Sequence, residues 1–267
     1  MEFSRFLDCL AADHARLRAV AAADLTAAVP TCPGWTVADL TRHVGQVYLH
    51  KTIGMREGAE PDEWPPSGLA GEEPLALLDR AYAELVAEFA AREPSDPTGT
   101  WYGPDQTVGF WIRRMAQETV IHRLDAELAT GSPVAPVPAD LAVDGVDELL
   151  TAFVAFGVAA WGDYFAGVLG TSPGRTYRFR TDGAAWRVRT GPGRFDVQTG
   201  DVQTGDVQTG DGADGEPDAD VTVTGAPTAL LRWVWNRQGA GEPDGVTVTG
   251  DAEAVDELQR CIVIATQ

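Results

Sequence analysis

The chain has 267 residues and only four histidines, and one of these histidines stands one helical turn after a glutamate. In the segment "MAQETVIHRLDAELATG", Glu118 and His122 are four residues apart, so a helix would place both side chains on one face. A carboxylate and an imidazole held in this way can bind one metal ion, as the two histidines of an HExxH helix do. The same spacing is also found in solvated pairs on helix surfaces, so both interpretations stay open on these two residues alone.

A second segment, "PGWTVADLTRHVGQVYLH", supplies further imidazoles. His43 and His50 are seven residues apart, two helical turns, and would share a face. In an antiparallel four-helix bundle, facing helices can build a metal site from such side chains. His43, Glu118 and His122 would form the two-histidine, one-glutamate set of catalytic zinc sites, with a fourth position open. For His14 and His50, a surface or hydrogen-bonded histidine is the favoured interpretation.

The first half of the chain must supply the helices that position these ligands. Apolar residues at helical spacing, separated by loops rich in proline and glycine, predict helices over about residues 2–23, 36–58, 74–92 and 109–131. Thr36 and Asp39 have the spacing of a capping box at the start of the second helix. Helices of this length with loops of medium length predict an antiparallel four-helix bundle over residues 1–135.

The second half changes character after a helical stretch over about residues 138–167. Alternating segments predict strands over residues 175–182, 184–190, 219–225 and 245–251, with helices over 226–237 and 251–263. We expect an α+β domain with an antiparallel sheet over residues 138–267, and hence an α+β protein of two domains. The tandem repeat "DVQTGDVQTGDVQTGD" at 196–211 has almost no apolar content and is expected to be a surface loop, with a calcium-binding β-roll as the alternative.

Composition excludes some classes of binding partner. The formal net charge is −20, from 40 acidic against 20 basic residues, which argues against a nucleic-acid partner and against an anionic membrane. Three scattered cysteines indicate neither a disulfide framework nor a thiolate zinc site. The first residues lack the apolar run of a signal peptide, and the most apolar stretch, 149–170, is interrupted by Asp163 and glycines. We therefore expect a cytoplasmic protein outside the membrane.

Three segments carry a resemblance to a known family. "VPTCPGWTVADLTRHVGQV", "WIRRMAQETVIHRLDAELATG" and "LAVDGVDELL" resemble the actinobacterial mycothiol-dependent maleylpyruvate isomerase family, which has a DinB/YfiT-like bundle. The closing "LLRWVWNRQGAGEPDGVTVTGDAEAVDEL" is similar to the family's second domain, which resembles sterol-carrier proteins. The resemblance implies that His43, Glu118 and His122 bind a divalent metal, usually zinc.

The resemblance also implies a catalytic arginine from the second domain, and Arg237 is its nearest match. Family members usually have glycine just before that arginine, whereas this chain has Asn236. The alternative is a surface arginine at a helix C-terminus, where the helix dipole favours a cation.

The resemblance implies that the thiol mycothiol is a cosubstrate. Metal coordination deprotonates a thiol at neutral pH and so makes it nucleophilic. The thiolate would add to a small electrophile, with Arg237 binding a substrate carboxylate, and would then remain attached (S-transfer) or leave after rotation (isomerisation). A second carboxylate should orient one ligating histidine, and Asp39 and Asp125 are candidates by helical position. A metal-dependent hydrolase acting through water and a noncatalytic metal- and ligand-binding protein are the alternatives. The oligomeric state does not follow from the sequence.

Overall fold

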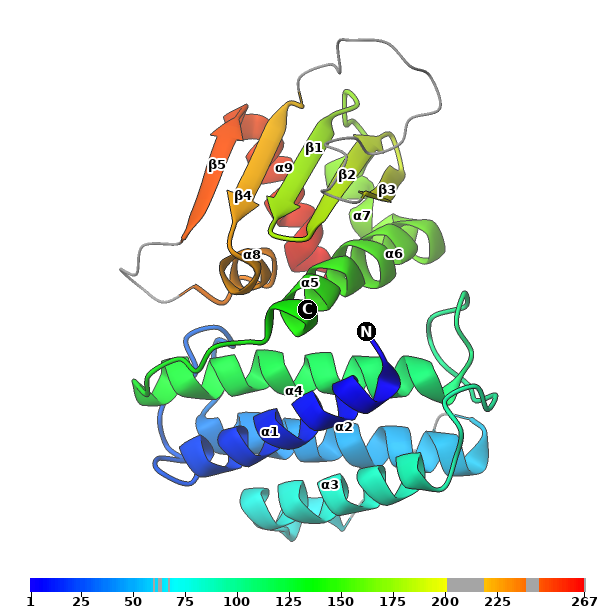
Figure 1. Cartoon of the computed structure of the whole chain (residues 1–267), viewed down its shortest axis with the longest axis vertical. Coiled ribbons are helices and arrows are strands. Elements are labelled where there is room, and N and C mark those ends of the chain that lie inside the picture. Colours follow the sequence, from blue (N-terminus) through cyan, green and yellow to red (C-terminus); the bar gives the residue numbers. More distant parts are fainter. Residues whose placement is uncertain (60, 62–63, 67, 201–218, 239–244, 267) are drawn as a thin grey trace. The chain divides into compact units, whose positions relative to one another are not determined.

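A computed structural model describes residues 1–59, 61, 64–66, 68–200, 219–238 and 245–266 of the chain (Figure 1). The chain divides into two compact units, Met1–Pro136 and Val137–Gln267. Each unit has its own core, and each is described by itself below. Among the described helices, none combines the length and the apolar composition needed to cross a membrane.

The first unit is a bundle of long helices: α1 (Phe3–Ala21), α2 (Val37–Glu57), α3 (Pro74–Ala90) and α4 (Val108–Thr130), with a short 3₁₀ turn, η1 (Leu69–Gly71). α1 packs against α4, α2 packs against α3, and α2 also contacts α4. Leucines such as Leu10, Leu40, Leu77 and Leu124 are fully buried and form the core. The helices lie where the sequence predicts them.

The ends of these helices have local causes in the sequence. The Thr36 side chain accepts a hydrogen bond from Asp39 N, and Asp39 Oδ2 accepts one from Thr36 N, which confirms the predicted capping box of α2. Thr107 caps α4, which ends at Gly131 in the left-handed region at φ 65°. α4 is buried on almost every face from Val108 to Glu127. Its charged residues therefore need partners inside the protein.

The second unit begins with a broken helical stretch: α5 (Ala139–Glu148), a π-helical turn η2 (Leu149–Ala155), α6 (Phe156–Ala160) and α7 (Gly162–Leu169). Five strands follow, β1 (Thr176–Thr181), β2 (Ala184–Gly191), β3 (Arg194–Gly200), β4 (Val221–Gly225) and β5 (Val246–Gly250). Helix α8 (Pro227–Val234) lies between β4 and β5 in sequence, and α9 (Ala252–Ala265) closes the chain.

The sheet has the order β3-β2-β1-β4-β5, and it is mixed. β1 and β4 pair in parallel, whereas the other neighbours are antiparallel, so the predicted antiparallel sheet is wrong at this one pair. Alternation of apolar and polar residues shows which faces are buried, but it carries no information on the direction of the neighbouring strand.

Strand β3 was absent from the sequence prediction. It includes residues 196–200, the first copy of the pentapeptide, so the predicted loop is wrong for these five residues. Phe195 is buried, and Val197 lies opposite Val188 of β2. The pairing of β3 with β2 therefore gives hydrogen-bond partners to backbone groups that a loop would expose to solvent. The later copies, residues 201–211, lie outside the described residues.

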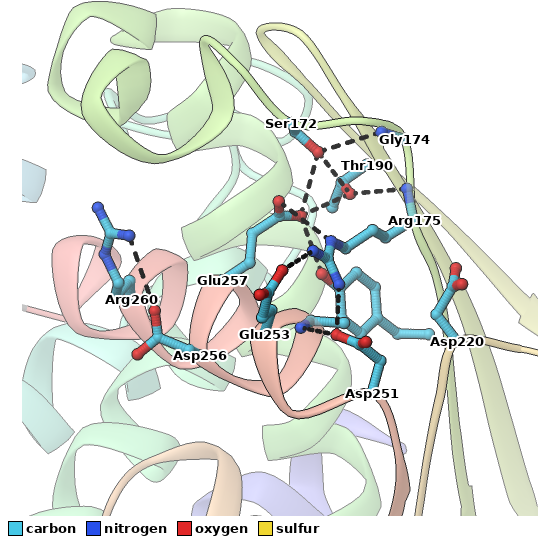
Figure 2. Close-up of polar contacts among 12 residues, drawn as sticks. Ser172, Gly174, Arg175, Thr190, Asp220, Asp251, Glu253, Asp256, Glu257 and Arg260 are labelled. Carbon is cyan, nitrogen blue, oxygen red and sulfur yellow. Dashed lines mark hydrogen bonds and ion pairs between the residues drawn. The ribbon is translucent and has the colours of Figure 1, made fainter.

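A buried carboxylate ties α9 to the sheet (Figure 2). Glu257 Oε1 accepts hydrogen bonds from the hydroxyls of Thr190 (2.8 Å), Tyr177 (2.9 Å) and Ser172 (3.2 Å). Arg175 Nε lies 3.7 Å from the other oxygen of the carboxylate. A buried carboxylate needs such donors, so this cluster fixes the helix against β1 and β2.

Candidate metal centre

His43 of α2 and Glu118 and His122 of α4 come together in the first unit. One ligand atom from each residue lies within 4.8 Å of the other two, and among the described residues this is the group of histidine, cysteine and acidic side chains with that arrangement. The spacing argument placed Glu118 and His122 on one helix face, and the contact between α2 and α4 adds His43. The structure thus brings together the three predicted ligands.

The two imidazoles face one carboxylate oxygen. Glu118 Oε1 lies 3.2 Å from His43 Nε2 and 3.1 Å from His122 Nε2. The two rings are 5.0 Å apart between centroids and nearly perpendicular, at 80°. The side chain of His43 is 35% exposed, whereas those of Glu118 and His122 are 13% and 10% exposed. The cluster is therefore open to solvent on the side of His43.

Each ligand has a second contact that fixes it. His122 Nδ1 donates to Asp125 Oδ2 at 2.9 Å, so Asp125, one of the two candidate carboxylates, orients the His122 ring. Asp39, the other candidate, serves the cap of α2 instead. Arg114 Nη2 donates to Glu118 Oε2, the carboxylate oxygen that faces away from the imidazoles. The Trp35 ring packs on His43 with 5.0 Å between centroids.

Sequence reasoning missed Arg114 and Trp35. Arg114 stands four residues before Glu118, the same spacing that indicated the Glu118–His122 pair, so the signal was present in the sequence. Trp35 lies in a loop, where no periodicity exists to indicate a contact.

Electrostatics in the metal-free cluster favours an ion pair. Burial alone would raise the pKa of Glu118, but the positive charges of His122 and Arg114 hold that pKa well below its usual range. Burial alone would lower the pKa of His122, but the carboxylates of Glu118 and Asp125 raise it to about 9. The cluster thus holds a proton at neutral pH, in a place where a cation is stabilised.

The donor set fits a divalent metal. The Asp125 carboxylate accepts from His122 Nδ1, so once His122 has lost its other proton its lone pair lies on Nε2, the atom that faces Glu118. Arg114 occupies one oxygen of Glu118 and leaves the other to the imidazoles. Two imidazole nitrogens and one carboxylate oxygen are a zinc ligand set, and in the described part of the chain no fourth histidine, cysteine or acidic ligand joins them.

The two remaining histidines have other surroundings. His14 is buried and stacks on Tyr82 with 3.7 Å between ring centroids. Burial lowers the pKa of His14 to about 4, so this imidazole is neutral at physiological pH. His50 Nδ1 lies 3.1 Å from Lys51 Nζ, and the His50 ring meets the edge of Trp64. Neither histidine belongs to the cluster.

Arg237 lies in the second unit, just after α8. Its Nη1 donates to Trp235 O at 2.5 Å, so the guanidinium lies at the C-terminal end of the helix, where the helix dipole favours it. The preceding residue, Asn236, adopts φ 54°, in the left-handed region. Asparagine is one of the few residues besides glycine that enters this region readily. Asn236 therefore fits the backbone conformation at this position.

Comparisons with known proteins cover nearly the whole chain. A family model described as "Mycothiol maleylpyruvate isomerase N-terminal domain" matches residues 7–127, and one described as "MDMPI C-terminal domain" matches residues 140–257. A crystal structure of the mycothiol-dependent maleylpyruvate isomerase is similar with a TM-score of 0.61 and 14% identity, over 94% of this chain and 95% of that chain. A histidine-to-alanine mutant of that protein gives a TM-score of 0.62 and 13% identity over the same shares. The structural likeness concerns the fold alone. No curated protein matches this sequence.

Proposed function

The chain belongs to the mycothiol maleylpyruvate isomerase family, and we propose that it is a thiol-dependent enzyme with a divalent metal, Zn²⁺ being the simplest choice. Its reaction is either the cis-trans isomerisation of a small anionic electrophile or S-transfer, in which mycothiol stays attached to the electrophile through its sulfur. Mycothiol is the cosubstrate in both cases. The observation that carries this proposal is the convergence of His43 Nε2, His122 Nε2 and Glu118 Oε1 in a site open on one side.

The protein's own residues prepare the site for this chemistry. Asp125 holds His122 with its Nδ1 proton turned away from the site, and Arg114 keeps Glu118 ionised. When bound, the metal would lower the pKa of a coordinated thiol, so that the thiol is a thiolate at neutral pH. A thiol that is already a thiolate needs no general base, and His43 and His122 could not act as one while their Nε2 lone pairs were bound to the metal.

The thiolate then forms a C–S bond to an activated double bond of the electrophile, and the π electrons move onto the conjugated carbonyl oxygen. The former double bond is now a single bond and can rotate. Return of the electrons breaks the C–S bond, releases the thiolate and leaves the other isomer. If the carbanion is protonated before this return, the sulfur stays attached, and the outcome is S-transfer.

The metal ligands are tested by metal analysis of the purified full chain. We expect about one divalent metal per chain in the wild type and a loss of that metal in His122→Ala. His50→Ala is the matched control, because His50 lies on α2, the helix of His43, but outside the cluster. Unchanged metal content in His122→Ala would show that the proposed ligand set is wrong.

The reaction type is tested by mixing the zinc-loaded chain with maleylpyruvate, with and without mycothiol. Isomerisation that requires the thiol without consuming it supports the isomerase, and loss of free thiol supports S-transfer. Hydrolysis without thiol would favour the metal-dependent hydrolase. No turnover of any kind would favour the noncatalytic binding protein.

We also propose that Arg237 binds a carboxylate of the substrate through its planar guanidinium. Arg237→Ala should then lower kcat/KM for an anionic electrophile. The loss corresponds to about 2–4 kcal/mol of transition-state stabilisation, and metal content should be unchanged. Arg260→Ala is the matched control, since Arg260 is exposed on α9 and pairs with Asp256. For an uncharged electrophile, kcat/KM should change little in either variant. An equal loss for the charged and uncharged electrophiles would exclude carboxylate binding by Arg237.

A further inference from the structure

The segment between α1 and α2 closes into a compact loop, Val29–Trp35, next to the metal centre. Val29 N donates to Trp35 O at 2.9 Å, and Trp35 N donates to Cys32 O at 3.0 Å, so the two ends of the loop are held together. Gly34 takes φ 86°, a left-handed conformation that suits a residue without Cβ. The loop is thus closed by its own backbone hydrogen bonds.

This loop contacts His43 directly and reaches His122 through Asp125. At one end Trp35 packs on the ring of His43. In its middle, the Thr31 hydroxyl donates to Asp125 Oδ1, and Cys32 Sγ lies 3.9 Å from Asp125 Oδ2. Asp125 Oδ2 is also the acceptor for His122 Nδ1.

The side chain of Asp125 is fully buried, and both of its oxygens are used. One oxygen serves the loop, and the other serves the ligand His122 together with Cys32. A buried carboxylate is costly without such donors, so loss of either contact disturbs the other. The ligand and the loop therefore share one carboxylate.

We propose that Asp125 is a positioning residue that couples the metal centre to the Val29–Trp35 loop. It holds His122 with Nε2 toward the metal site and, through Thr31, holds the loop that packs Trp35 on His43. This inference rests on the proposed metal centre. Because coupling is reciprocal, a loosened loop weakens metal binding, and bound metal makes the loop harder to open.

Two variants separate the two contacts of Asp125. In Asp125→Asn the side chain can still accept from Thr31, but its NH₂ group would face His122 Nδ1 and favour the tautomer with the proton on Nε2, which leaves no lone pair on Nε2 to ligate a metal there. Thr31→Val has nearly the same shape and removes only the hydroxyl of the loop. Thr26→Val is the matched control, because Thr26 Oγ1 makes the same kind of bond to Asp24 Oδ1, at 2.7 Å, on the surface.

The experiment measures Zn²⁺ affinity of the full chain by chelator competition, and hydrogen exchange of the peptide that spans the loop, with and without Zn²⁺. Asp125→Asn should lose about 10–100-fold in affinity, as is usual for a partner of a ligating histidine. Thr31→Val should lose about fivefold, one hydrogen bond's worth, and should also lose the protection that Zn²⁺ gives the loop. Thr26→Val should match the wild type in both measurements.

Three outcomes would overturn the inference in different places. Wild-type affinity in Asp125→Asn would exclude its role in orienting His122. Wild-type affinity in Thr31→Val, with loop exchange that Zn²⁺ leaves unchanged, would exclude the coupling even if Asp125→Asn failed to fold. Retention of Zn²⁺ by His122→Ala, by contrast, would show that the proposed metal centre itself is wrong.

Discussion

Zinc binding to this chain should become stronger by about tenfold for each pH unit between about pH 7 and about pH 9. The cause is the proton that the metal-free cluster holds on His122, whose pKa is raised to about 9 by Glu118 and Asp125 against the effect of burial. A metal ion can bind Nε2 only after that proton has left. At pH 7, two units below this pKa, removal of the proton costs about 2.7 kcal/mol, which is about a hundredfold in affinity.

The stability of the metal-free chain should change in the opposite direction. A histidine whose folded pKa lies above its unfolded value stabilises the fold, and this contribution is fully present below the unfolded value of 6.5 and is lost as the pH rises through about 9. The metal-free first unit therefore becomes less stable over the range in which zinc binds more strongly. In the proposed metal centre, the metal would replace the proton as the cation beside Glu118.

The assay combines two measurements on the full chain. Zn²⁺ affinity is measured against a chelator of known protonation behaviour at several pH values from about 7 to about 8.5. Calorimetry in two buffers of different ionisation enthalpy then gives the number of protons released on binding, which should be close to one at about pH 7.5. An affinity that stays constant over this range, or binding without proton release, would refute the argument that His122 is protonated in the metal-free cluster.

Three further predictions concern residues outside the ligand set. Glu257→Leu should lower the free energy of unfolding of the second unit by about 3–5 kcal/mol, because three buried hydroxyls lose their common acceptor, whereas Glu257→Gln keeps an acceptor and should cost about 1–2 kcal/mol. Hydrogen exchange of that unit measures both, and a Leu variant as stable as the wild type would contradict the assignment. Asn236→Gly should change the free energy of unfolding by less than about 1 kcal/mol. Asn236→Val should lower it by about 1–2 kcal/mol, because a β-branched residue resists the left-handed conformation. Urea unfolding measures both, and equal stabilities of the two variants would argue against that strain. Deletion of residues 201–210 should leave zinc content and melting temperature nearly unchanged, since these ten residues have little apolar content and all three proposed ligands lie elsewhere. A large loss of either would assign these residues a structural role.

Local signals in the sequence account for the parts of the structure that were predicted. The capping box at Thr36 depends on residues three apart, and the end of α4 depends on one glycine, Gly131. Glu118 and His122 share a face for the same reason, because four residues make about one helical turn. His43 required one further step, the contact of α2 with α4 in the helical bundle.

Non-local pairing accounts for what was missed. The parallel pairing of β1 with β4 joins Tyr177 to Val221, residues far apart in sequence, and alternation within either strand is silent about this partner. Strand β3 escaped because its buried residue, Phe195, is followed by repeat residues with the composition of a loop. Thr31 and Trp35 escaped because loop residues follow no period, so only the fold shows that they reach Asp125 and His43.

The charges around the cluster also bear on what the site binds. With both histidines neutral, Arg114 offsets one of the carboxylates of Glu118 and Asp125, which leaves one negative charge in a largely buried place. A net buried charge is costly, and in the metal-free state the proton on His122 removes it. A divalent metal in place of that proton leaves one positive charge instead, which one anionic sulfur would neutralise. This charge balance favours a thiolate over a neutral thiol as the bound form, and it is set by Arg114 and Asp125 as much as by the three ligands.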